Sequence, residues 1–336
     1  MKTSSNQLRI SVLVNNYNYA PYLAAALDSA ISQLQAGDEI IFVDDGSTDE
    51  SVTIAQRYKA KHGVTLISQE NGGQLSAVRA GVLAAQGEVV VLLDSDDLLL
   101  AGYLNKLRQI YTENPDLTFV FSAPEVFGST EKNMAGISKA MRNMAFPQGR
   151  VGPTKWGAIL FHEFVSTPTS GISMRKSLAE KTVSIPAHPN RTEIMTPTMR
   201  RMFSISEGEA LHQNIAADAI IVRCASALGV DKYYNDQPGF RYRIHGNNKW
   251  ASISRVSRWY LRRARSRQIR EAYQTTFGIT VHPKTAELHY EICNRSWSTY
   301  LPRQVRKRAE YFLATFLSKG SFKEKLITAA AAVGIR

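Results

Sequence analysis

The sequence predicts an α/β fold, with a single, mainly parallel sheet flanked by helices and a basic helical extension at the C-terminus. In residues 1–122, apolar runs typical of strands alternate with segments of helical periodicity. The strand-like runs are apolar at every position, as expected when helices cover both faces of a parallel sheet. Residues 255–336 are instead rich in Arg and Lys within helix-like segments, which predicts the extension.

Five strands are expected in the N-terminal third. Each is a short run of β-branched or other apolar residues bounded by polar or turn-forming residues. They are expected at residues 8–15, 39–44, 64–68, 88–94 and 118–122.

Helices are expected between these strands, at residues 21–35, 48–61, 74–86 and 101–113. Pro21 suits the first turn of the first helix, and Asp49 suits the positive N-terminal end of the second. Gly87 is typical of a residue that ends a helix, and Pro115 follows the fourth helix. The alternation implies right-handed βαβ units and hence a Rossmann-like parallel sheet.

Composition and length are those of a globular protein of one large domain or two. Of the 336 residues, 44% are hydrophobic and 21% are charged. No apolar run approaches the roughly 20 residues that span a bilayer, and no signal peptide is recognisable at the N-terminus. Two cysteines cannot form a disulfide framework. We therefore expect a cytoplasmic protein, peripheral on the inner face of the membrane if the basic extension binds lipid.

Charge is unevenly distributed along the chain. Residues 1–122 contain eight Lys and Arg against 14 Asp and Glu, a net charge of −6, whereas residues 255–336 contain 17 against five, a net charge of +12. The basic extension would attract an anionic membrane surface or nucleic acid. Nucleic acid is disfavoured because the N-terminal part is acidic and no known nucleic-acid-binding module is recognisable. The alternative is a pair of solvated helices that only cover the rest of the fold.

Polar residues follow three of the predicted strands, at residues 15–18, 44–47 and 94–97. The carboxyl ends of parallel strands meet at one edge of the sheet, where ligands bind in such folds. Carboxylates gathered there repel one another unless a cation is present, and Mg²⁺ or Mn²⁺ prefers oxygen ligands and phosphate partners. The alternative is that residues 44–49 form only a turn and a helix cap, and residues 94–97 only a polar loop.

Four segments together resemble the family 2 glycosyltransferases, which have the A-type nucleotide-sugar-binding fold. They are SVLVNNYNYAPYLAAALDSAISQ, DEIIFVDDGSTDES, ENGGQLSAVRAG and GEVVVLLDSDDLL, at residues 11–33, 38–51, 70–81 and 87–99. The resemblance implies that a sugar is transferred with inversion from a nucleoside diphosphate sugar, here a UDP-sugar, to an acceptor hydroxyl. It also implies Mn²⁺ or Mg²⁺ as the cofactor.

The resemblance assigns nucleotide contacts to five residues of the N-terminal part. Asn15 and Tyr17 would contact the nucleobase and ribose, and a carboxylate of the pair Asp44 and Asp45 would hydrogen-bond the uracil ring. Arg79 would lie on the helix that packs over the diphosphate.

The segment from Asp94 to Asp96 matches the Asp-x-Asp motif of the family. The resemblance places Asp94 on hydroxyls of the ribose or donor sugar and Asp96 on the metal, and Ser95 between them is grouped with the substrate-binding residues.

Two further motifs resemble the acceptor side of the family. Thr169 lies in a Pro-Thr-Ser-Gly segment that some members place beside the acceptor, although a plain polar loop is the alternative. An inverting enzyme needs a general base near the acceptor hydroxyl. The family carries it at the start of an apolar helix, which points to Asp218, with His212 as the alternative base.

Residues 242–248, YRIHGNN, match an element that closes over the donor site in the family. The resemblance implies that Arg243 pairs with phosphate and that His245 ligates the metal or the diphosphate, although a lone histidine is more often structural.

These assignments divide the chain into three expected parts. Residues 1–122 would bind the nucleotide sugar, residues 123–254 would carry the acceptor side and the base of the same domain, and residues 255–336 would be the extension. We therefore expect a metal-dependent hexosyltransferase acting on a saccharide or lipid-linked acceptor, in surface polysaccharide, lipopolysaccharide or glycolipid synthesis. A nucleotidyltransferase and a non-catalytic polyanion- or membrane-binding protein on a transferase scaffold are the alternatives.

Overall fold

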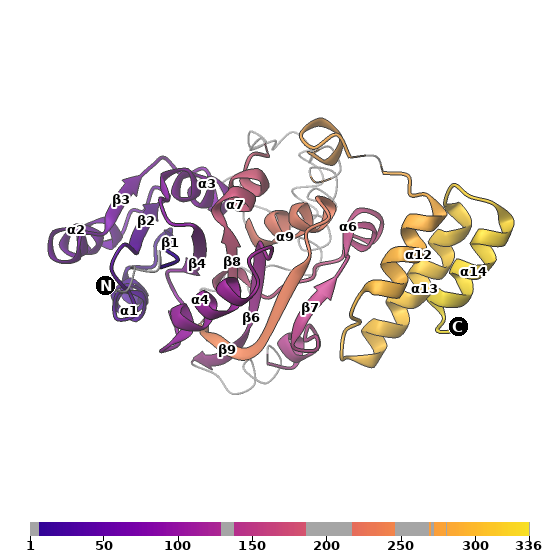
Figure 1. The fold of residues 1–336 in the computed structure, drawn as a ribbon. Helices are drawn as coiled ribbons and strands as arrows, with labels where there is room; N and C mark the ends of the chain where they lie inside the picture. The colour runs from indigo at the N-terminus through magenta and orange to yellow at the C-terminus, as the bar shows by residue number, and fades with distance from the viewer. Residues whose placement is uncertain are drawn as a thin grey trace, which may run out of the picture.

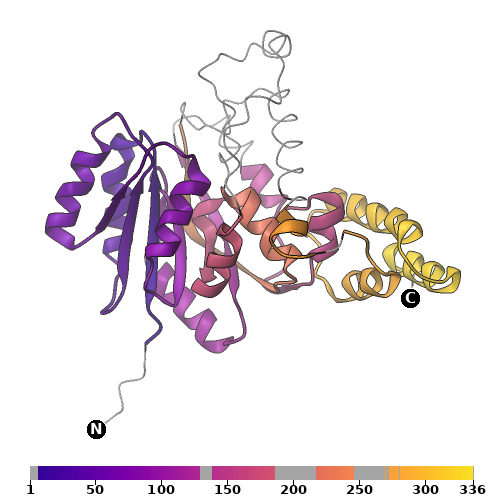
Figure 2. The same ribbon diagram turned by 90° about the horizontal axis from the view of Figure 1, so that it is seen from above.

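The computed structural model describes residues 7–128, 138–185, 217–245, 269, 272–279 and 281–335. A central sheet lies between helices, and three C-terminal helices lie at the opposite end of the molecule from β2 and β3 (Figure 1). The view from above shows the same separation (Figure 2). The α/β fold with a helical C-terminal region is therefore confirmed.

One sheet contains the nine strands of the described residues, in the order β3-β2-β1-β4-β8-β6-β9-β5, with β7 paired to β9 beside this path. The bounds are Ile10–Asn16 (β1), Glu39–Asp44 (β2), Thr65–Ser68 (β3), Val89–Asp94 (β4), Leu98–Leu99 (β5), Phe119–Gly128 (β6), Gly149–Gly152 (β7), Ile172–Arg175 (β8) and Lys232–Ile244 (β9). Strands β1 to β4 pair in parallel. Antiparallel pairing enters with β8, which lies between β4 and β6.

Helices cover both faces of this sheet, and each face has its own apolar core. Buried side chains of α1, α2 and α4 pack on one face, and those of α3, α7 and α9 pack on the other. The bounds are Ala20–Ile31 (α1), Ser51–His62 (α2), Gln74–Ala84 (α3), Tyr103–Glu113 (α4), Lys155–Phe161 (α6), Lys176–Val183 (α7) and Ala217–Ala227 (α9), with a 3₁₀ turn at Thr169–Gly171 (η1).

Most element positions follow from the sequence pattern. The strand expected at residues 39–44 is confirmed at both ends, and α3 begins at Gln74 as expected. The strand expected at residues 118–122 extends to Gly128 as β6, because β9 pairs with it along its whole length. The strands β5, β7, β8 and β9 are not among the five expected strands.

Three helices form the described C-terminal end of the chain: α12 (Thr285–Asn294), α13 (Leu301–Leu317) and α14 (Phe322–Ala332). The Arg-rich residues 255–268 lie outside the described residues. Among the helices that the structure describes, each is too short or too polar to span a bilayer.

A buried ionic network ties α12 and α13 to the sheet domain. Arg295 donates to the Glu163 carboxylate (3.0 Å) and to the Tyr311 hydroxyl (2.7 Å), and Tyr311 donates to Glu291. Glu291 in turn accepts the backbone N–H groups of the first turn of α6, at Trp156 (2.7 Å) and Gly157 (2.9 Å). Because both acids and Arg295 are buried, loss of either side would leave an unpaired buried charge.

Candidate active site

Strand register brings the three polar strand ends to one edge of the sheet. Asn15 of β1 lies beside Asp94 of β4, and Asn16 lies beside Asp44 of β2. The register of the parallel pairing fixes these neighbours, because parallel strands that pair in register end at the same edge of the sheet. The side chains that follow the strands therefore form one site.

The centre of the site is an acidic cluster formed by Asp94, Asp96 and Asp97. One carboxylate oxygen from each lies within 4.8 Å of the others. Burial, followed by repulsion from Asp96, raises the pKa of Asp94 to about 7. Burial and the charges of Asp96 and Asp94 likewise hold the pKa of Asp97 well above its usual range. Concentrated negative charge of this kind is stabilised by a bound cation.

Two amide side chains orient the Asp94 carboxylate. Asn15 and Gln74 each donate to its Oδ1 atom, both at 2.8 Å. The Oε1 atom of Gln74 also accepts the backbone N–H of Ala217 (3.0 Å), at the start of α9. Gln74 thus joins β4 to α9, and sequence reasoning missed it. Its place directly after two glycines, at the start of a helix facing the strand ends, was the available signal.

Asp97 connects the 3₁₀ turn to β9. Its Oδ2 atom accepts the hydroxyl of Ser170 (2.6 Å), and its Oδ1 atom accepts the backbone N–H of Arg243 (2.8 Å). The Ser170 hydroxyl also accepts the backbone N–H of Asp94 (3.0 Å). Ser170 was not among the expected site residues, and Asp97 was expected only as one of the carboxylates of residues 94–97.

Asp96 faces His245, with 3.0 Å between its Oδ2 atom and the Nε2 atom of the imidazole. The histidine ring packs on Tyr22 at a centroid distance of 4.7 Å and edge-on to Tyr19 at 5.6 Å. Burial, followed by the charge of Asp96, raises the pKa of Tyr19. The structure therefore brings Asp96 and His245 together beside the start of α1, at the ends of β4 and β9.

Arg243 braces the loop that carries the acidic cluster. Its Nε atom donates to the backbone carbonyl of Asp96 (2.7 Å). Its guanidinium lies 4.9 Å from the ring centroid of Tyr22 and 4.4 Å from that of Phe127. Such cation–π stacking holds the planar group in a fixed orientation.

The buried carboxylates Asp44 and Asp45 bond within the chain. Asp44 accepts from the Asn16 amide (3.0 Å) and from the backbone N–H of Ser47 (2.9 Å), which is the geometry of a turn. Asp45 accepts the backbone N–H groups of Gly72 (2.9 Å) and Gly73 (2.8 Å). These bonds place the loop before α3, so Asp45 indirectly positions Gln74.

Gly46 is required between these loops. Its φ of +78° is in the left-handed region, and a Cβ atom would lie 2.8 Å from the backbone nitrogen of Asn71.

The remaining expected residues have varied positions. Ser95 is buried and donates to Asn16 Oδ1 (2.7 Å), so it joins β4 to β1. Thr169 is buried in η1, with its hydroxyl 3.4 Å from the Gln74 amide nitrogen. Tyr17 is half-buried after β1, and Arg79 is exposed on α3.

Asp218 lies in the first turn of α9 and is half-buried. Its charge contributes to the raised pKa of Asp94, after burial and Asp96, which shows that the two carboxylates share one electrostatic environment. The alternative base His212 lies outside the described residues, as do residues 246–248 of the closing motif.

The donor atoms of the site match a hard divalent cation. Three carboxylates converge, and an imidazole nitrogen lies 3.0 Å from one of them. Mg²⁺ and Mn²⁺ prefer oxygen donors, and imidazole is also a common ligand of transition metals.

Comparison with known proteins agrees with this geometry. The family model described as "Glycosyl transferase family 2" matches residues 11–176. An uncharacterized glycosyltransferase of Nostoc sp. is 30% identical over 253 residues, which cover 74% of this chain and 69% of that relative. Glycosyltransferase GlyG of Streptococcus pneumoniae is 37% identical over 102 residues, 30% of this chain and 34% of GlyG.

A solved structure has a similar fold. A crystal structure of S. aureus TarS 1–349 in complex with UDP-GlcNAc superposes with a TM-score of 0.51 over 97% of this chain and 88% of that one, at 15% identity. At this identity the likeness shows the fold alone. The family match and the Nostoc relative show more: the chain belongs to the family 2 glycosyltransferases.

Proposed function

We propose that this glycosyltransferase is metal-dependent and inverting, and that it moves a hexose from a UDP-sugar to an acceptor hydroxyl. The observation that supports this most is the partly buried acidic cluster of Asp94, Asp96 and Asp97 beside the start of α9. A donor diphosphate is anionic and needs compensation, whereas an acceptor hydroxyl needs a base. The same edge of the sheet offers residues for both needs.

In this proposal Asp96 and His245 hold Mn²⁺ or Mg²⁺. When bound, the cation compensates the charge of the diphosphate leaving group. Arg243 keeps the Asp96 backbone in place, and the positive charge of its guanidinium would pair with phosphate. Asp94, fixed by Asn15 and Gln74, accepts hydroxyls of the ribose or donor sugar.

The proton of the acceptor hydroxyl passes to Asp218. A carboxylate at the first turn of a helix is kept ionised by the helix dipole and is ready to act as a base. Thr169 lies between the two halves of the site and would face the acceptor.

Nucleobase recognition is proposed for Tyr17, Asn15 and the pair Asp44 and Asp45, with Arg79 on the diphosphate side. The bonds within the chain mean that Asp44 and Asp45 would also shape the base pocket through their loops. The structurally similar TarS was crystallised with UDP-GlcNAc, which makes UDP-sugars the first donors to test.

The acceptor is proposed to be a saccharide or a lipid-linked saccharide of surface polysaccharide, lipopolysaccharide or glycolipid synthesis. The net charge of +12 in residues 255–336 supports an anionic membrane as the place of reaction, on the inner face. Residues 1–122 and 123–254 would then supply the donor and acceptor halves of the site.

The test is product release from a panel of nucleotide sugars, with and without Mn²⁺. Release of nucleoside diphosphate from one donor, dependent on metal and acceptor, supports the proposal. Release of sugar 1-phosphate would indicate nucleotidyl transfer instead, and metal-dependent binding without any release would indicate a non-catalytic protein. Asp116→Asn is a matched control for carboxylate variants, because Asp116 is exposed and forms a surface salt bridge with Arg150.

A further inference from the structure

Exposed apolar side chains are concentrated in the C-terminal helices. Of the 13 large apolar side chains that are exposed in the described part of the chain, 12 lie within residues 290–335, and Leu83 is the exception. Scattered exposed leucines are ordinary on protein surfaces, but a gathering in one region marks an interaction surface.

The turn between α13 and α14 carries the densest group, which we call the apolar tip. It comprises the exposed side chains Leu313, Phe316, Leu317, Phe322 and Leu326. The three on α13 are spaced to lie on one helix face, and those on α14 are one turn apart. Leu317 is 88% exposed and Phe322 is 72% exposed.

The two halves of the apolar tip are held together. Lys325 of α14 donates to the backbone carbonyl of Phe316 at the end of α13 (3.1 Å). Ser321 caps α14 in a reciprocal pair of hydrogen bonds with Glu324, so the chain turns sharply between the helices. The apolar tip is therefore a turn held by hydrogen bonds, and its apolar side chains face outward.

The opposite face of α13 packs against the rest of the protein. Tyr311 is fully buried in the network with Arg295 and Glu291, which docks the helix against the sheet domain. The exposed face is thus the one that remains available to a partner.

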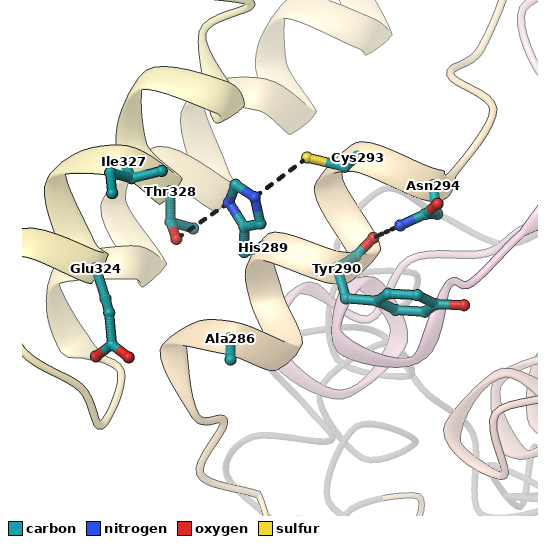
Figure 3. Close-up of a pocket in the computed structure, with 8 residues that line it drawn as sticks. All are labelled: Ala286, His289, Tyr290, Cys293, Asn294, Glu324, Ile327 and Thr328. Atoms are coloured by element: carbon teal, nitrogen blue, oxygen red, sulfur yellow. Dashed lines mark hydrogen bonds between the residues drawn. The ribbon is translucent and has the colours of Figure 1, made fainter. Parts of the chain in front are cut away.

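A shallow groove extends this apolar surface from α14 to α12 (Figure 3). It has a volume of about 390 Å³ and is lined by Ile327 and Thr328 of α14 and by Tyr290 and His289 of α12, among others. His289 bonds to Thr328 (3.4 Å) and contacts Cys293 (3.7 Å), so its polar atoms have partners within the groove.

The charge around the apolar tip favours one class of partner. Residues 301–335 contain seven Lys and Arg against two Glu, a net charge of +5. Lys319 and Lys323 are exposed within the turn itself. Two copies of this surface facing each other would bring like charges together, whereas an anionic lipid surface would complement them.

We propose that the apolar tip inserts into the interfacial layer of an anionic membrane, with Lys319 and Lys323 on the lipid headgroups. Basic side chains beside exposed Leu and Phe are typical of segments that lie in this layer. The proposal deepens the proposed function, since it names where the enzyme would meet a lipid-linked acceptor. The binding itself does not depend on catalysis.

The test is co-sedimentation of the full chain with vesicles of phosphatidylcholine alone, or mixed with phosphatidylglycerol. We expect binding to the mixed vesicles that weakens as salt rises. The double variant L317S/F322S should bind the mixed vesicles at least about tenfold more weakly than the unmodified chain, because it loses two large apolar groups. L83S removes the exposed leucine outside the C-terminal helices and is the matched control.

Cooperative thermal melts check that both variants fold, and donor turnover with a water-soluble acceptor checks the site separately. Unaltered turnover with lost vesicle binding supports the proposal, whereas lost turnover with normal vesicle binding counts only against the proposed function. Two results would overturn the membrane surface: no binding of the full chain to mixed vesicles at low salt, or L317S/F322S binding as well as L83S. A concentration-dependent dimer that L317S/F322S disrupts, without vesicle binding, would assign the surface to a second copy.

Discussion

Replacing Gln74 by Ala tests how the two halves of the site are joined. The substitution removes the 2.8 Å hydrogen bond to Asp94 and the 3.0 Å hydrogen bond from Ala217. A hydrogen bond to a charged group contributes about 1.5–3 kcal/mol, and each factor of ten in rate corresponds to about 1.4 kcal/mol. We therefore expect kcat/KM to fall by about 10- to 100-fold, toward the lower value because Asn15 still holds Asp94.

The assay is steady-state release of nucleoside diphosphate, with kcat and KM for the donor separated. Gln86→Ala is the control, because Gln86 lies near the end of α3 and is exposed. Gln74→Glu should be at least as impaired as Gln74→Ala, since it places a further carboxylate beside Asp94. If Gln74→Ala retained the kcat/KM of Gln86→Ala, the reasoning that links α3, β4 and α9 would be refuted.

Two further predictions concern the base and the C-terminal network. Asp218→Asn should leave donor binding intact, as measured by calorimetry, and lower the transfer rate by about 10²–10⁴-fold, the usual contribution of a general base; near-normal transfer would indicate another base. Arg295→Ala should destabilise the fold by about 3–5 kcal/mol in denaturant unfolding, because it removes the closest cationic partner of the buried Glu163 carboxylate, whose contact to Arg303 is longer, at 4.0 Å. Arg150→Ala, which removes a more exposed ion pair, should lower the free energy of unfolding much less. Equal losses for the two variants would contradict a stabilising role of the buried network.

The fold could be predicted where local pattern decides it. The strand at residues 39–44 was placed at both ends because a continuous apolar run is bounded by polar residues. The strand β8 was missed because it has only four residues, so its apolar–polar alternation is too short to stand out, and its place depends on pairing with β4 and β6 on either side.

The acidic residues of the site could be predicted from the sequence, but their hydrogen-bond partners could not. Strand register gathers Asp94 and Asp96 at one edge, and that edge could be inferred from parallel topology. The partners of these acids, Gln74 and Ser170, depend on side-chain geometry across α3 and η1, which spacing in the sequence does not reveal.

The role of the C-terminal helices could not be seen in the sequence either. Arg295 and Glu163 are separated by 132 residues, and neither belongs to a recognisable motif. Their pairing makes α12 and α13 part of the packed core, so removal of residues 255–336 should impair folding and not only membrane binding.

The most direct test of the central claim is calorimetry of UDP binding with and without Mn²⁺, to the unmodified chain, Asp96→Asn and Asp116→Asn. An amide oxygen is a poorer ligand than a carboxylate for a hard cation. We predict that Mn²⁺ strengthens UDP binding to the unmodified chain and to Asp116→Asn but not to Asp96→Asn. An equal effect of Mn²⁺ on Asp96→Asn would contradict a metal–diphosphate site at the acidic cluster.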